Sequence, residues 1–125
     1  MDYLKFLDDL LSATIIKGGA ILNNNGKVLA ISKDLIINSN DISTIIQAFF
    51  SPTLLINRIC YFNNKKFNYI ASDNTYIHGQ LEDNFILIER TGLNIIIAVY
   101  DQNVELKDAD AVVRKLTKSL YNADY

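Results

Sequence analysis

The chain has 125 residues, half of them hydrophobic, with a formal net charge of -2 and a single cysteine, Cys60. This length and hydrophobic content are sufficient for one globular domain, spanning residues 1–125, that buries its own core without disulfides or a bound metal. The weak negative charge argues against binding to nucleic acid or to an anionic membrane, and the lone cysteine excludes an internal disulfide and is compatible with the cytoplasm.

The first residues are predicted to form a helix with a wide apolar face. Asp2 is a candidate N-cap for a helix over residues 3–12, and Tyr3 and Phe6 lie at the edge of its apolar arc. A core-facing stripe needs a narrower arc, so we expect these rings either to pack beneath another element or to remain exposed for a partner. Charges interrupt this segment too often for a signal peptide, and no apolar stretch of the chain is long enough to span a membrane.

A hairpin and a second helix follow. Apolar runs at Gly18–Leu22 and Lys27–Ser32 flank Asn23–Gly26, whose residues tolerate positive φ, and this pattern is typical of a hairpin. Apolar residues then recur at helical spacing over residues 42–50, after capping candidates at Asn38–Asp41. The sequence therefore predicts a middle helix.

The second half of the chain is rich in short strand-like segments. Polar turns separate them, which favours an antiparallel meander. The last segment is apolar enough to be a central strand covered on both faces. A final helix is expected over residues 108–121, with a stripe of apolar residues on its buried side. The expected strands are residues 59–62, 67–71, 75–78, 85–89 and 94–100.

This order of elements predicts the fold class. An α+β domain is expected, with a central antiparallel sheet of about six to seven strands, the N- and C-terminal helices together on one face and the middle helix on the other. No linker, repeat or low-complexity segment divides the chain.

The sequence offers no arrangement typical of catalysis. His78 is the sole histidine, so neither a two-histidine metal site nor a Ser/His/Asp triad has independent support. The paired aspartates near the ends of the first and last helices are explained by helix-end electrostatics. We therefore expect a protein that is not an enzyme and that uses no metal or cofactor.

Several segments in the same order and spacing resemble the profilin family. Met1–Leu11 has two aromatic residues three positions apart and then an acidic pair, as the family does. Gly19–Ser32 and Asn40–Phe50 are similar to its hairpin and its middle helix. Ile88–Gly92 resembles its basic-Thr-Gly signature, and residues 111–116 resemble its last helix. Each motif is weak alone, but together they cover nearly the whole chain.

The resemblance implies a monomeric, cytoplasmic protein that binds monomeric actin, regulates its polymerisation, and binds proline-rich segments between its terminal helices. Such a groove makes physical sense, because a polyproline II segment is already ordered and docks between aromatic rings at small entropic cost. Leu29 stands where the family has a Trp, so we expect weakened proline binding. The residues carried over to this groove are Tyr3, Phe6, Leu29, Ser119, Leu120 and Tyr125.

The resemblance also marks residues for the other partners. The actin candidates are Lys66, Arg90 and Val104 by motif, and Lys107, Asp110 and Arg114 by their place on the outward face of the last helix. Phosphoinositide binding is expected to be weak, because Glu82 lies in a turn where many relatives are basic. Its remaining candidates are Lys65, Lys66 and Arg90.

Two other non-enzymatic classes fit the same order of elements. A roadblock or longin scaffold would dimerise and bind a small GTPase or a tethering partner, and it would not need the rings of Tyr3 and Phe6. A small ligand-sensing domain would need polar residues facing a cavity, which the middle strands do not show. The position of the terminal helices distinguishes these classes, because profilin requires them side by side.

Overall fold

The structure is a computed structural model that describes residues 3–13, 15–50, 61–62, 65–72 and 75–123. Over these residues the chain forms three helices, α1 (Tyr3–Ser12), α2 (Ser39–Phe50) and α3 (Leu106–Asn122). The strands of the same ranges are β1 (Gly18–Asn23), β2 (Val28–Ile31), β3 (Leu35–Ile36), β4 (Tyr61–Phe62), β5 (Lys65–Lys66), β6 (Asn68–Ser72), β7 (Tyr76–Leu81), β8 (Asn84–Arg90) and β9 (Asn94–Asp101).

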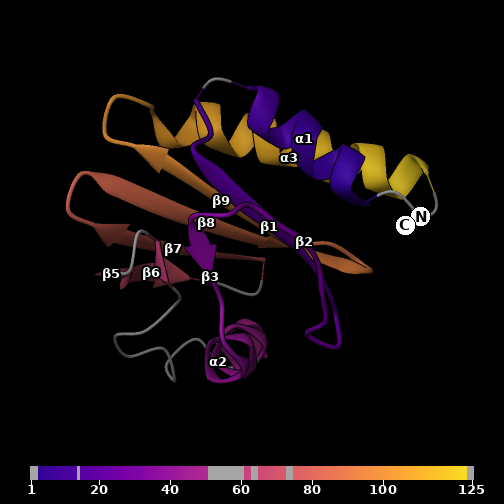
Figure 1. Cartoon of the computed structure of the whole chain (residues 1–125), viewed down its shortest axis with the longest axis horizontal. Coiled ribbons are helices and arrows are strands. Elements are labelled where there is room, and N and C mark those ends of the chain that lie inside the picture. The colour runs from indigo at the N-terminus through magenta and orange to yellow at the C-terminus, as the bar shows by residue number, and fades with distance from the viewer. Residues whose placement is uncertain (1–2, 14, 51–60, 63–64, 73–74, 124–125) are drawn as a thin grey trace.

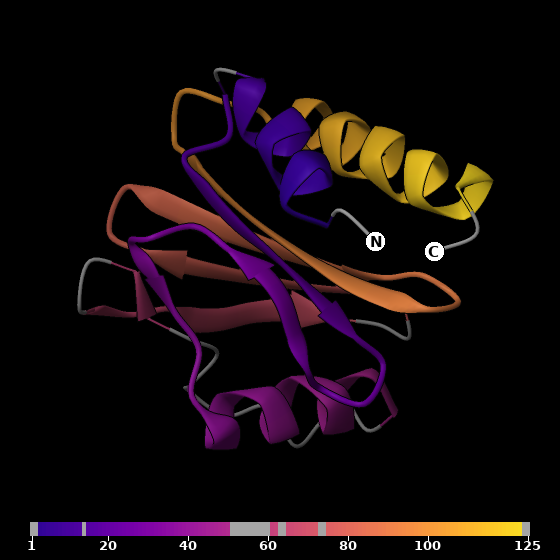
Figure 2. The same cartoon turned by 45° about the vertical axis from the view of Figure 1, so that its right-hand side comes forward.

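A central antiparallel sheet separates two helical layers. Within the described ranges it has six strands in the order β2-β1-β9-β8-β7-β6. Helices α1 and α3 lie together on one face and α2 lies on the other (Figure 1). In the turned view α1 and α3 again lie side by side over the same face of the sheet (Figure 2). The predicted α+β architecture is confirmed.

The sheet buries a hydrophobic core on each face. One core lies between the sheet and α2 and includes Phe49 and Ile97. The other lies between the sheet and the terminal helices and includes Leu7, Leu116 and Tyr100. Strand β9 contributes side chains to both cores, because successive residues of a strand point to opposite faces. Its predicted place as a central, doubly covered strand is confirmed.

The expected meander is only partly correct. Strands β6 to β9 follow one another as neighbours, as predicted, but β4 does not join them. It pairs instead with β3 and β5 in a separate small sheet of the described residues. The apolar pattern of residues 59–62 indicates a strand. It does not indicate which strand pairs with it, because that depends on which strand the folded chain places beside it. Residues 59 and 60 of that predicted strand lie outside the described residues.

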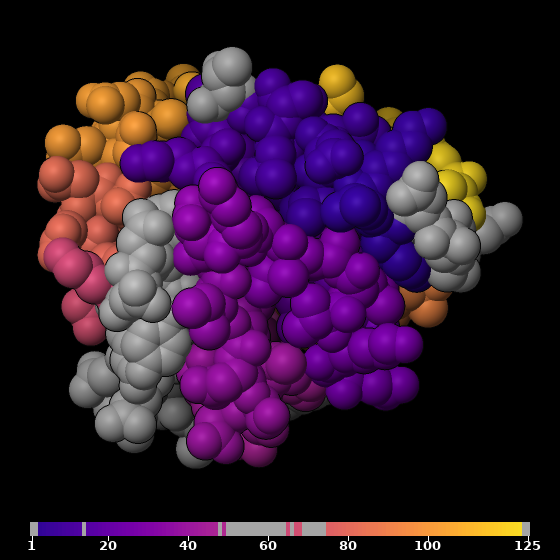
Figure 3. Space-filling view, viewed as in Figure 1, coloured from indigo at the N-terminus to yellow at the C-terminus, as the bar shows by residue number. Residues whose placement is uncertain are grey.

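Helix α1 approaches the sheet closely because β1 contains a glycine at the crossing. Leu7 and Leu10 of α1 are buried on the side of the helix that faces the sheet. A Cβ atom on Gly19 would stand 2.8 Å from Cδ2 of Leu10 and 2.9 Å from the carbonyl oxygen of Ile97. Figure 3 shows the atoms of α1 lying directly against those of the strands that follow it. The missing side chain of Gly19 therefore sets the height of α1 above the sheet.

Local capping fixes the start of α2. The backbone N–H of Asp41 donates to Oδ1 of Asn38 at 2.9 Å, and the backbone N–H of Asn38 donates to Oδ2 of Asp41 at 3.2 Å. This reciprocal pair is a capping box, which satisfies two donors at the helix end. The predicted cap within Asn38–Asp41 is thus confirmed.

Helix α3 begins at Leu106, before the predicted start at residue 108. Its four fully or nearly fully buried residues, Ala109, Val113, Leu116 and Leu120, follow the predicted stripe, while Val112 is only partly buried. No helix in the described part of the chain has the length and apolar character needed to cross a membrane.

Candidate functional site

The aromatic residues of α1 lie against the core that the terminal helices share. Tyr3, Phe6 and Leu29 are partly buried and pack against the same hydrophobic cluster, which brings α1 and β2 together. Leu120 is fully buried in that cluster, so it supports this surface from below and exposes no area to a ligand. Three of the residues expected to bind proline-rich segments, Tyr3, Phe6 and Leu29, therefore pack against one cluster. Tyr125 lies outside the described residues.

A cavity of about 410 Å³ follows the seam between the two terminal helices. Of the residues expected to bind proline-rich segments, it includes Ser119, whose hydroxyl donates to the carbonyl oxygen of Lys115 at 3.0 Å. Tyr3 and Phe6 do not line it. The cavity is bounded by Asp9, Leu10, Ser12, Ala13, Val112, Lys115, Leu116 and Ser119. Its α1 residues come from the C-terminal half of that helix, so it lies further along the seam than the rings.

A second candidate surface lies between α3 and the strands beneath its outward side. Two cavities, of about 380 and 450 Å³, adjoin each other and share the lining residues Thr75, Glu89 and Arg114; together they are here called the α3–β8 cleft. Four of the six residues expected to bind actin line it, namely Arg90, Lys107, Asp110 and Arg114. The other residues that line it are Tyr76, Leu87, Thr91, Leu106, Thr117, Lys118 and Tyr121.

The remaining actin candidates lie elsewhere. Val104 is half-buried and packs against the core of the terminal helices, just before α3. Lys66 is in β5, which belongs to the small sheet, and its side chain lies outside the described residues.

A carboxyl pair occupies the floor of the α3–β8 cleft. Glu89 is only 9% exposed, and its carboxyl group is hydrogen-bonded to that of Asp110. Arg114 in turn donates from Nε to Oδ2 of Asp110 at 2.8 Å. Oε2 of Glu89 is buried and has no hydrogen-bond partner among the described residues.

The environment of this pair shifts the pKa values of the two carboxyl groups in opposite directions. Burial, followed by the adjacent Asp110, raises the pKa of Glu89 to about 8. The hydrogen bond from Glu89, helped by Arg114, lowers the pKa of Asp110. At neutral pH Glu89 therefore carries a proton, which it donates to the Asp110 carboxylate. Sequence reasoning missed Glu89, although a charged residue directly after the apolar run Phe85–Ile88 of β8 was a visible signal.

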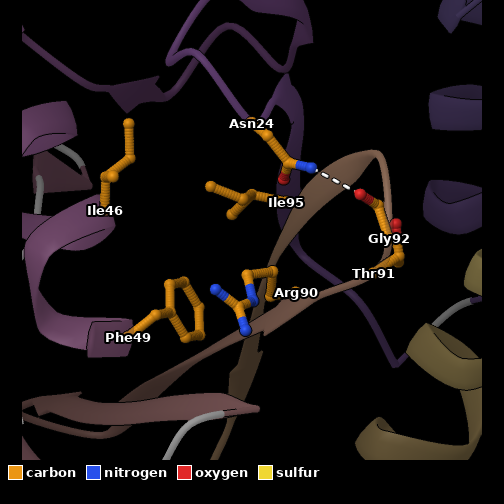
Figure 4. A pocket seen from close by; sticks show the side chains of 7 residues that line it. All are labelled: Asn24, Ile46, Phe49, Arg90, Thr91, Gly92 and Ile95. Atoms are coloured by element: carbon orange, nitrogen blue, oxygen red, sulfur yellow. Dashed lines mark hydrogen bonds between the residues drawn. The ribbon is translucent and has the colours of Figure 1, made fainter.

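Arg90 lies where the α3–β8 cleft meets the opposite side of the sheet. Its guanidinium carbon lies 5.6 Å from the centroid of the Phe49 ring of α2. Both residues line a cavity of about 240 Å³, in which Nδ2 of Asn24 donates to the carbonyl oxygen of Gly92 at 2.6 Å (Figure 4). A cation over a ring is attracted by its negative face, so Phe49 helps to hold Arg90 in place.

The basic residues considered for phosphoinositide binding do not meet in one cavity of the described residues. Nζ of Lys65 forms an ion pair with Oε1 of Glu82 at 2.7 Å, and both side chains are more than half exposed. Arg90 lies instead at the end of β8. Glu82 thus partly neutralises the one lysine of this group whose side chain is described.

His78 takes part in an aromatic stack. Its ring is stacked with those of Phe85 and Tyr100, at centroid distances of 5.6 and 6.1 Å. Burial lowers the pKa of His78 and raises that of Tyr100 to about 12. In the described ranges, no group of three His, Cys, Asp or Glu side chains is placed to hold a metal ion.

Comparison with known sequences gives a match over the full length of the chain. The family model described as Profilin matches residues 1–125. Profilin-A of Physarum polycephalum is 25% identical over 126 residues, which cover 100% of both chains. Profilin-1 of Dictyostelium discoideum is 28% identical over the same length and coverage.

Comparison with solved structures gives the same fold. Profilin IA of Acanthamoeba castellanii has a TM-score of 0.84 at 19% identity, covering 98% of this chain and 99% of that one. A chain from the complex of LokiProfilin2 with rabbit actin has a TM-score of 0.71 at 19% identity, with coverages of 97% and 96%. A chain from mouse profilin IIa in complex with a double repeat of the mDia1 FH1 domain has a TM-score of 0.71 at 15% identity and covers 100% of both chains.

Proposed function

The chain belongs to the profilin family, and on that basis we propose that it binds monomeric actin and proline-rich segments on separate surfaces. Among proteins of the same fold, one is in a complex with rabbit actin and another with an FH1 repeat. The side-by-side terminal helices favour this function over a roadblock or longin scaffold. The protein would act in the cytoplasm as a monomeric regulator of actin polymerisation, and not as an enzyme.

The α3–β8 cleft is the proposed centre of the actin-binding surface. The observation that supports this assignment is that four residues expected from the sequence to bind actin line these two adjoining cavities, namely Arg90, Lys107, Asp110 and Arg114. Val104 adds an apolar side chain near the start of the same helix. Lys66 stays a proposed contact. Charged groups around an apolar anchor are typical of a specific protein interface.

The rings of α1 are the proposed centre of the proline-binding surface. Tyr3 and Phe6 share a hydrophobic cluster with Leu29, and they leave part of their area accessible because none of the three is fully buried. Ser119 and Tyr125 are proposed to complete this surface, with Leu120 packed beneath it. Since Leu29 replaces a ring, this surface should bind proline-rich ligands more weakly than a typical relative does.

Phosphoinositide binding is at most a minor property in this proposal. The ion pair between Lys65 and Glu82 reduces the local positive charge. Lys66 and Arg90 would remain the principal contacts for an acidic head group.

A titration of labelled protein tests both surfaces. Monomeric actin should shift the amide NMR signals around Arg90, Val104 and Arg114, whereas a proline-rich peptide should shift those around Tyr3 and Phe6. The absence of shifts with both ligands would refute the proposed function. Shifts by both ligands at the same residues would refute the assignment to separate surfaces.

Charge reversal tests the actin surface more sharply. Arg114→Glu should weaken actin binding by roughly tenfold or more, because it removes an interface arginine and places an acid beside Asp110. Lys33→Glu changes the charge equally at an exposed position outside the cleft and serves as the matched control. Equal affinities of the two variants would show that the cleft does not bind actin.

A further inference from the structure

Glu89 is an unusual residue for the middle of a core-forming sheet. It lies on β8, opposite Tyr76 of β7 and Ile96 of β9, and it lines both cavities of the α3–β8 cleft. It is nine-tenths buried, and one carboxyl oxygen has no hydrogen-bond partner among the described residues. An ionised carboxylate in that position would be costly, because burial removes most of its hydration and no donor among the described residues reaches that oxygen.

The groups that face Glu89 come from several elements. On α3, Asp110 accepts its hydrogen bond and Arg114 binds Asp110 in turn. Its cross-strand partner on β9 is apolar, and its partner on β7 is a tyrosine. The titratable and charged residues that line the cleft around it are Tyr76 of β7, Arg90 of β8, and Lys107, Asp110, Arg114, Lys118 and Tyr121 of α3.

We propose that Glu89 is a positioning residue of the actin-binding surface, which holds Asp110 and Arg114 in place through a hydrogen bond that exists only while Glu89 carries a proton. This inference rests on the proposed function. When Glu89 loses its proton, the two carboxylates repel each other, and Arg114 is the cation that must balance both negative charges. The side chains of α3 that face the partner then lose their fixed arrangement.

The same geometry makes actin binding sensitive to pH. A partner that covers the cleft removes the remaining water from around Glu89, which disfavours its ionised form still more. Binding should therefore favour the protonated form and take up a proton from solution near the pH at which free Glu89 titrates. Because that pH is about 8, affinity should fall as the pH rises from neutral to mildly alkaline values.

Calorimetry of the full chain with monomeric actin tests this inference. At pH 8, titrations in two buffers of different ionisation enthalpy should show a net uptake of protons by the wild type. Between pH 7 and pH 8.5 the dissociation constant of the wild type should rise about fourfold, the loss expected when a group of pKa near 8 must be protonated to bind. Glu89→Gln, which keeps the shape and cannot ionise, should show neither the proton uptake nor the rise of the dissociation constant with pH.

A carbon NMR titration of the free protein gives an independent readout. The Glu89 carboxyl signal and the backbone amides around Asp110 and Arg114 should shift together with one apparent pKa near 8. A Glu89 carboxyl that titrates near its ordinary value would overturn the inference, with or without actin. Proton release instead of uptake, or equal pH dependence in Glu89→Gln and the wild type, would also overturn it. Loss of actin binding at every pH would instead refute the proposed function, and the NMR titration would still decide whether Glu89 positions α3.

Discussion

Nε2 of His78 lies 2.6 Å from the hydroxyl group of Tyr100, although their strands β7 and β9 are separated in the sheet by β8. The ring of Phe85 on β8 bridges this gap, since its centroid lies 5.6 Å from that of His78 and 5.5 Å from that of Tyr100. The raised pKa of Tyr100, about 12, keeps its hydroxyl protonated. A protonated phenol and a neutral imidazole can each donate or accept, so the tautomer of His78 sets the direction of this hydrogen bond.

Acid should destabilise the protein through His78. Burial holds the pKa of His78 below its ordinary value of 6.5, so the unfolded chain binds the proton first as the pH falls. Stability is then lost from about pH 6.5 down to the lower pKa of the folded state. Urea unfolding at a series of pH values should show this loss in the wild type and a smaller one in His78→Gln. Identical curves for both proteins would exclude His78 as the cause.

Glu89→Gln should stabilise the free protein at neutral and alkaline pH. The pKa of Glu89 is about 8 in the folded state against an ordinary value of 4.5, so its contribution to stability is present below pH 4.5 and is lost as the pH rises to about 8. The glutamine has no proton to lose. Thermal unfolding at pH 8 should show a gain on the order of 1–3 kcal/mol, the cost of an uncompensated buried polar group. The gain should shrink toward pH 5, and a gain that is constant with pH would contradict this account.

Gly19→Ala should destabilise the fold. The added methyl group would stand 2.8 Å from Cδ2 of Leu10 and 2.9 Å from a backbone oxygen, so α1 would have to move away from the sheet. Overpacking of this kind costs about 1–3 kcal/mol, measured by chemical unfolding. Gly92→Ala is the matched control, because a Cβ there meets nothing within 4 Å. If both variants lost the same stability, close packing at Gly19 would not be the reason.

Leu29→Trp should strengthen the binding of proline-rich peptides. Leu29 is partly buried beside the cluster that includes Tyr3 and Phe6, and a Trp there would add a flat ring and an indole N–H. An added aromatic contact of about 0.5–1.5 kcal/mol corresponds to roughly twofold to twelvefold tighter binding. Since the natural chain has no Trp, the indole fluorescence reports the titration directly. Ile36→Trp, at an exposed position of β3, should add fluorescence without affinity.

Much of this architecture could be predicted because it depends on local patterns. The apolar spacing of α2 and its capping pair, Asn38 and Asp41, stand together in the sequence, and the helix begins where they place it. The apolar run of β9 indicates a doubly covered strand without reference to any other segment. The periodicity of apolar residues indicates which side of an element is buried, and this information was sufficient to predict α2 and β9.

The features that the sequence did not predict depend on contacts between segments that are distant in the chain. The pattern at Tyr61 and Phe62 predicts a strand, but the choice of β3 as its partner follows from the path of the whole chain. The protonated state of Glu89 likewise arises only because α3 lays Asp110 against it. The two halves of the α3–β8 cleft come from separate elements, so its candidates on α3 and at Arg90 could be named while the residue between them was missed.

The place of β1 in the sheet has a consequence for how the molecule forms. Residues Gly18 to Asn23 of β1 pair along their whole length with β9, from Val99 to Asn94. Strand β1 thus lacks this neighbour until the chain has been synthesised through β9. Pairing over so long a stretch of sequence is slow because the connecting loop must close first. We therefore expect folding to be cooperative, with a truncated chain that ends before β9 unable to dock α1.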